Sequence, residues 1–95
     1  MRKEEIIQRL EVLRDAAQWE YDVTAQRHSA TADDYTLVVE RRGAEGQCGW
    51  LVKHARYGEL MAWTPCLTAA YGKRDALDFT RSHVLGHYEP QHAEG

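Results

Sequence analysis

Three short apolar segments, separated by brief turns, constrain this fold more than any other feature of the sequence. They are "YTLVVER" (35–41), "CGWLVKH" (48–54) and "ELMAW" (59–63). Each is rich in β-branched and aromatic residues, which is typical of strands. The glycine-bearing stretches "RGAEGQ" and "ARYG" separate them. Because a parallel crossover needs a dozen or more residues, such short connections predict antiparallel neighbours.

The two ends of the chain show helical periodicity instead. Residues 2–17 carry apolar side chains on one helical stripe, namely Ile6, Leu10, Leu13 and Ala17. A final helix is predicted over residues 73–85, with Gly86 just beyond its end, where glycine adopts positive φ at no steric cost. This boundary predicts that His83 lies in the last helical turn and that His87 lies outside the helix.

Two segments allow alternative interpretations. Residues 19–26, "WEYDVTAQ", alternate with a period of two and predict a strand, although an extension of the first helix is the competing interpretation. In residues 64–72, "TPCLTAAYG", Thr64 is a candidate cap for a short helical turn with Pro65 at its first position. An irregular segment is equally compatible with these residues.

The predicted fold is therefore α+β, in the order α-β-β-β-β-α. It has an antiparallel four-stranded sheet, or a three-stranded one if residues 19–26 are helical, with an N-terminal and a C-terminal helix. The segment "HSATADD" (28–34) is interpreted as a polar connection. We expect a single domain over residues 1–88 and a flexible polar tail over residues 89–95.

Composition limits the classes of function. The chain has 95 residues and a formal net charge of -3, so it lacks the overall basic field that favours nonspecific nucleic-acid or membrane-surface binding. No apolar run approaches the length of a membrane span, and the charged N-terminus shows no signal-peptide pattern. We therefore expect a cytoplasmic protein with no membrane contact, in which Cys48 and Cys66 are reduced thiols.

No residue pattern indicates catalysis, a metal or a cofactor. A zinc site could be imagined from four residues, Cys48, Cys66, His83 and His87, but their spacing matches none of the short-loop ligand pairs typical of structural zinc. The glycines near residue 46 lie between two strands and not before a helix, which argues against a phosphate-binding loop. We expect a protein that is not an enzyme and that needs no cofactor.

The segment "GKRDAL" (72–77) places two cations, Lys73 and Arg74, at the predicted start of the last helix. Free N–H groups at a helix start suit a bound phosphate, so these residues are an anion-binding candidate. The segment and the order of elements resemble the double-stranded-RNA-binding domains, whose second helix has a basic start. The resemblance implies a nucleic-acid- or phosphate-binding module, supported by Arg41, Arg42, Lys53 and Arg56. The chain departs from that family in its negative charge and in Glu45, which replaces a histidine-bearing motif.

The strands carry large apolar side chains at positions out of phase with their main apolar face. These residues are Val38, Leu51, Met61 and Trp63. Since two helices cover only one face of a sheet, we expect residues 64–72, a second copy of the chain or a partner to cover the other. Scattered exposed apolar residues are the alternative explanation. The predicted function is a small protein-interaction or regulatory domain that binds a protein partner or forms a homodimer, and nucleic-acid binding is the second hypothesis.

Overall fold

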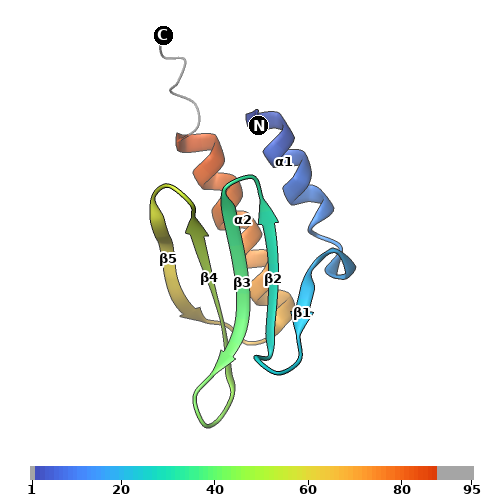
Figure 1. Ribbon diagram of the computed structural model, residues 1–95, viewed down its shortest axis with the longest axis vertical. Helices are drawn as coiled ribbons and strands as arrows, with labels where there is room; N and C mark the ends of the chain where they lie inside the picture. The colour runs from blue at the N-terminus through green and yellow to red at the C-terminus, as the bar shows by residue number, and fades with distance from the viewer. Residues whose placement is uncertain (1, 88–95) are drawn as a thin grey trace.

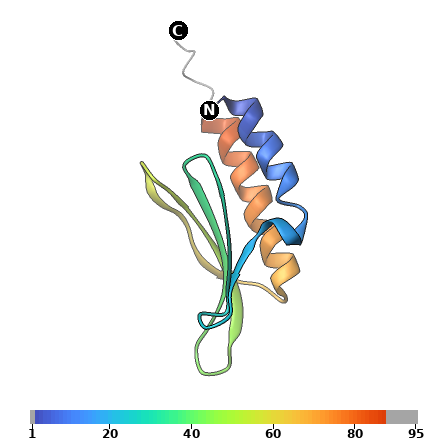
Figure 2. The ribbon, with the colours of Figure 1, turned by 45° about the vertical axis from the view of Figure 1, so that its right-hand side comes forward.

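The computed structural model describes residues 2–87, which form two helices and a five-stranded sheet (Figure 1). The helical elements are α1 (Lys3–Val12), a single 3-10 turn η1 (Ala16–Gln18) and α2 (Ala69–His87). The strands are β1 (Glu20–Asp22), β2 (Arg27–Ala32), β3 (Tyr35–Arg42), β4 (Gln47–His54) and β5 (Gly58–Pro65). They lie in the sheet in chain order, each antiparallel to its neighbours. Both helices pack on one face of the sheet (Figure 2).

This arrangement confirms the α+β fold and the antiparallel sheet, but the predicted number of strands is wrong. The missing strand is β2, which was interpreted as a polar connection. It pairs with β3 along its whole length, from Arg27 opposite Glu40 to Ala32 opposite Tyr35. Its buried apolar side chains are only two alanines, which are too small to give a visible apolar alternation in the sequence.

The segment 19–26 contains a strand, although a shorter one than predicted. β1 covers three residues, and a turn over residues 23–26 leads into β2. The alternative of a longer first helix is wrong, because α1 ends at Val12 and η1 follows after a break. Trp19 stabilises the chain at this break, since its buried indole N–H donates a hydrogen bond to the carbonyl oxygen of Leu13 at 2.6 Å.

α2 begins four residues earlier than predicted. The hydroxyl of Thr68 accepts a hydrogen bond from the backbone N–H of Tyr71 at 3.2 Å, which makes Thr68 the cap of the helix. Thr64 and Pro65 belong to the end of β5 instead. Gly72 lies inside α2, where a Cβ would stand 2.9 Å from the Cys66 sulfur and 3.0 Å from a methyl carbon of Val39. The glycine therefore permits close packing of the helix on the sheet.

The predicted helix end at Gly86 is also wrong. α2 continues through Gly86 to His87, and Gly86 does not adopt positive φ. His83 and His87 thus both belong to the helix. The predicted tail over residues 89–95 lies outside the described residues.

A hydrophobic core fills the space between the helices and the sheet. α1 contributes Ile6, Leu10 and the following Leu13, and α2 contributes Ala76, Leu77 and Val84. The strands contribute alternate residues, among them Leu37, Val39 and Val52, each of which is fully buried. Neither helix in the described part of the chain combines the length and apolarity that crossing a membrane requires.

Candidate functional site

The face of the sheet turned away from the helices carries most of the residues predicted to bind a partner. Figure 1 looks onto this face, with α2 behind the strands. Val38 lies directly opposite Leu51 in the β3–β4 ladder, and both point away from the helices, since their neighbours in each strand enter the core. We call this surface the open face. Its residues are Arg27, Ser29, Thr36, Val38, Glu40, Arg42, Gly49, Leu51, Lys53 and Trp63.

Trp63 covers part of the open face with its indole ring. A Cβ on Gly49 would overlap this ring at Cε2, so the indole lies directly on the glycine backbone. The guanidinium carbon of Arg42 stands 5.2 Å from the centroid of the indole, a cation–π distance. The indole Nε1 is buried and has no hydrogen-bond partner among the described residues.

Met61 does not share this face, although the prediction grouped it with Trp63. It lies opposite Val52 in the β4–β5 ladder and packs against the core beside the helices. The reason is a pair of register shifts, each of which inserts an extra residue into β5. Because side chains alternate in a regular strand, one extra residue between positions 61 and 64 places Met61 and Trp63 on opposite faces.

Glu40 is a nearly buried carboxylate at the centre of the open face. Its side chain is 10% exposed and accepts hydrogen bonds from Arg27 Nε at 3.0 Å and Arg42 Nε at 2.8 Å. Burial alone raises the pKa of this carboxyl. The hydrogen bonds and charges of the two arginines more than offset burial and hold the pKa below its ordinary value. Glu40 therefore stays ionised and fixes both guanidiniums over the sheet.

These residues surround a shallow concavity of about 410 Å³ on the open face. Val38 and Leu51 form its apolar part, and they are 8% and 4% exposed even though neither helix of residues 2–87 covers them. Three cations against one carboxylate leave the lining positively charged, in a chain whose net charge is negative. Contact of Val38, Leu51 or Trp63 with a partner stays a prediction.

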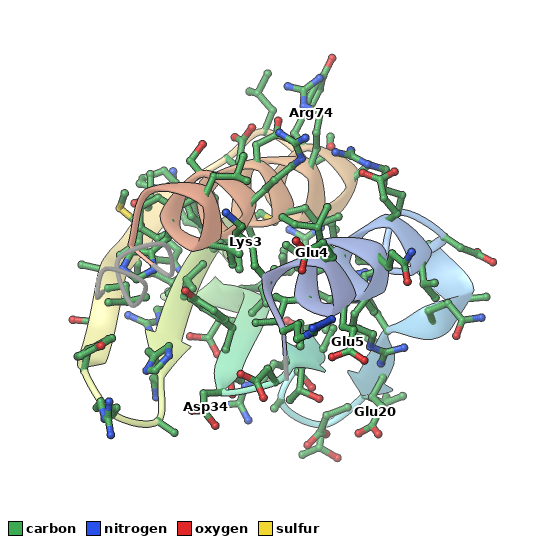
Figure 3. All side chains as sticks on the ribbon, turned by 90° about the horizontal axis from the view of Figure 1, so that it is seen from above. Lys3, Glu4, Glu5, Glu20, Asp34 and Arg74 are labelled. Carbon is green, nitrogen blue, oxygen red and sulfur yellow. The ribbon has the colours of Figure 1, made fainter. Side chains whose placement is uncertain are left out.

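The anion-binding candidates Lys73 and Arg74 lie in the second turn of α2, not at its start. The Lys73 ammonium stands 5.6 Å from the centroid of the Trp19 ring, and burial lowers its pKa. Arg74 lies over the Tyr71 ring and projects from α2 away from the sheet (Figure 3). Both residues border a second concavity of about 250 Å³, whose other lining residues are Leu13, Arg14, Ala16, Ala70 and Leu77. The predicted pair is thus separated from the basic residues of the open face.

An aromatic and histidine cluster closes the end of the core. The Tyr35 hydroxyl and His83 Nδ1 are 2.7 Å apart, a hydrogen bond whose direction depends on the histidine tautomer. His54 packs edge-on against Tyr35 and accepts the backbone N–H of Arg56 at its Nδ1. Burial, with smaller contributions from neighbouring acidic groups, raises the pKa of Tyr35 to about 12. These contacts assign His83 a packing and hydrogen-bonding role, which spacing in the sequence did not reveal.

Cys48 and Cys66, considered above with the two histidines, lie against each other with 3.3 Å between their sulfurs. Within residues 2–87, no group of three or more His, Cys, Asp or Glu side chains is placed to hold a metal ion. The expectation that the protein carries no metal stays a prediction.

Sequence reasoning identified Val38, Leu51 and Trp63 but missed Glu40 and Gly49 as parts of the same surface. A glycine inside a strand is a usable signal, because it often marks close approach of another group. The charged residue was less visible, since a glutamate near a strand end is usually solvated. Scans of the chain against protein-family models, curated proteins and solved structures give no match.

Proposed function

We propose that this protein is a small binding domain that takes an acidic protein segment on its open face and acts by binding, not by catalysis. The observation that carries the proposal is the arrangement of Trp63, Arg42 and Glu40 on a face that neither α1 nor α2 covers. In this proposal the protein is cytoplasmic and regulates the partner that it binds.

The composition of the open face supports a protein partner. Tryptophan and arginine are enriched at the energetic centres of protein interfaces. The side chains of Arg27 and Arg42 are 47% and 51% exposed, so each guanidinium meets solvent while it is held by Glu40. A guanidinium carries five N–H donors, and the bonds to Glu40 leave some of them for a carboxylate from outside.

Charge favours an acidic partner over a second copy of the chain. In a twofold dimer the same patch faces itself, so cations of the two lining surfaces would be brought together. Like charges opposed across an interface are unfavourable, whereas an acidic segment complements them. A homodimer is therefore one of the outcomes that the experiment must distinguish.

Nucleic-acid binding through the start of the last helix receives less support. The cations that line the two concavities lie apart, with those of the first on the open face and those of the second beside α2, on the other side of the sheet. A nucleic-acid surface usually gathers its phosphate-binding cations on one face. The double-stranded-RNA-binding domains that the sequence resembles also have fewer strands, in the order α-β-β-β-α, than the five-stranded sheet described here.

A peptide selection tests the proposal. Random peptides displayed on phage are selected against the wild-type protein, and the resulting peptides are titrated against two charge-reversal variants. Lys53→Glu changes an exposed lining cation of the open face, and Arg81→Glu makes the same change on the exposed side of α2. We expect acid-rich peptides that bind Lys53→Glu about tenfold more weakly, a loss of about 1.4 kcal/mol, and that bind Arg81→Glu like the wild type.

Four results would contradict the proposal. Selected peptides without acidic residues would refute the charge argument, and equal weakening by both variants would show a nonspecific charge effect. Light scattering that detects a dimer broken by Lys53→Glu would assign the face to self-association. Submicromolar binding of duplex RNA at physiological salt, lost in Lys73→Glu, would favour the nucleic-acid hypothesis.

A further inference from the structure

The two cysteines meet where β4 and the end of β5 lie side by side. Gly49 is paired with Pro65 in the antiparallel ladder, so the next positions outward along both strands are Cys48 and Cys66. The backbone N–H of Cys66 donates to the carbonyl oxygen of Cys48 at 3.0 Å, which holds the two residues together. Their sulfurs are 3.3 Å apart although the residues are separated by 18 positions in the chain.

This separation suits bond formation between the two sulfurs. A disulfide has an S–S length of about 2.05 Å, so the sulfurs need to approach by about 1.2 Å, which small side-chain rotations supply. Packing against α2 also restricts the position of the Cys66 sulfur, because that sulfur fits closely against the helix only where Gly72 has no side chain.

We propose that Cys48 and Cys66 form a reversible dithiol–disulfide site whose oxidant is a small-molecule disulfide of the glutathione type. Cys66 is the partly exposed member and reacts first, whereas Cys48 is buried. The Cys66 thiolate, having lost its proton to solvent, attacks one sulfur of the oxidant, forming a mixed disulfide and releasing one small thiolate. The Cys48 thiol then gives up its proton to solvent, its thiolate attacks the Cys66 sulfur and releases the second small thiolate, and the two leaving groups take up two protons. Two protein thiols are oxidised and one small disulfide is reduced to two thiols.

The surroundings of Cys66 set the rate of this reaction. Burial, followed by the hydrogen bond and charge of Cys48, raises the pKa of the Cys66 thiol to about 12. Because the thiolate is the nucleophile, little of the reactive form exists near neutral pH. We expect slow oxidation whose initial rate rises about tenfold per pH unit between about pH 7 and pH 9.

Intact-mass measurement of the folded 95-residue chain tests the proposal. The wild-type protein is incubated with oxidised glutathione, the reaction is quenched with acid, and the mass of the intact protein is measured by mass spectrometry. We expect a loss of mass equal to two hydrogen atoms, recovery of that mass with dithiothreitol, and a digest in which the peptides holding Cys48 and Cys66 are linked. The oxidised form should melt about 10 °C higher, because the bond closes a loop in the unfolded chain.

Two single variants serve as controls. Cys48→Ser and Cys66→Ser each retain one thiol, so neither is able to lose two hydrogens within one chain. We expect Cys48→Ser to stop at the glutathione adduct of Cys66. Wild-type protein that accumulates stable glutathione adducts, links separate chains, or stays fully reduced at pH 9 would overturn the proposal. These readings are made on the wild-type chain and do not depend on the folding of a variant.

Discussion

Leu37 and Leu51 lie on neighbouring strands and are both buried, yet they face opposite sides of the sheet. Leu37 is fully buried in the core beneath the helices. Leu51 is 4% exposed on the open face, where it lines the concavity together with the long side chains of Arg42 and Lys53. One face is therefore covered by separate elements of secondary structure, and the other by side chains of the sheet itself.

This difference has a physical consequence. A helix packed on a sheet does not move far enough to fill the space left by a shortened side chain beneath it, because close-packed interiors relax only partly. Long amphipathic side chains rearrange more readily and keep their charged ends in water. On the proposed function, the open face is therefore the side on which a bound partner would displace covering groups without unfolding the domain.

The largest expected effect comes from truncating matched leucines on the two faces. Leu37→Ala is expected to lower the free energy of unfolding by about 3 kcal/mol or more, because the helices and the sheet cannot close the cavity. Leu51→Ala should lower it by about 2 kcal/mol, at the low end for a buried leucine, since neighbouring side chains can fill the space. Urea denaturation of both variants measures the difference, and equal losses would show that the open face is as rigid as the core.

A smaller effect is expected from Gly49→Ala. The added methyl overlaps the Trp63 indole, which must move off the sheet. We expect a loss of about 1–2 kcal/mol, as for other overpacked sites. A double-mutant cycle with Trp63→Ala provides the control, because the cost of the methyl should largely disappear once the indole is absent. If the cost persists in that background, the indole does not depend on Gly49 for its position.

The smallest effect concerns the pH dependence that Glu40 confers. The pKa of Glu40 is lower in the folded protein than its ordinary value of 4.5, so its stabilising contribution is present above that pH. The contribution is lost as the pH falls through the folded-state pKa. Urea denaturation between about pH 3 and about pH 7 should show a loss of stability on acidification that is smaller in Glu40→Gln. If the wild type and Glu40→Gln lose the same stability on acidification, Glu40 is not the source of the pH dependence.

The strands rich in β-branched and aromatic residues were predictable from the sequence, and the elements with weaker signals were not. β3 and β4 combine β-branched residues with short connections, and the structure confirms both strands. β2 escaped prediction because its buried apolar residues, Ala30 and Ala32, are too small to stand out as an apolar alternation among polar neighbours. The start of α2 escaped it because residues 64–72 were compatible with a short helical turn or an irregular segment, whereas the structure places Gly72 inside the helix, close to Cys66 and Val39.

The candidate site divides in the same way. Alternation within β3 and within β4 set Val38 and Leu51 out of phase with the main apolar positions of their strands, and the register of the ladder places the two residues opposite each other on one face. The same rule failed for Met61, because extra residues in β5 break the period and no signal in the sequence marks them.

The sequence alone determined which segments alternate, which connections are short and hence that the sheet is antiparallel, because these are local properties of consecutive residues. Only the tertiary structure decided which face the helices cover, how Arg27 and Arg42 meet Glu40, and that Cys48 lies beside Cys66. Those contacts join residues on different elements, so they depend on strand register and on helix packing. Neither is specified by the spacing of residues along the chain.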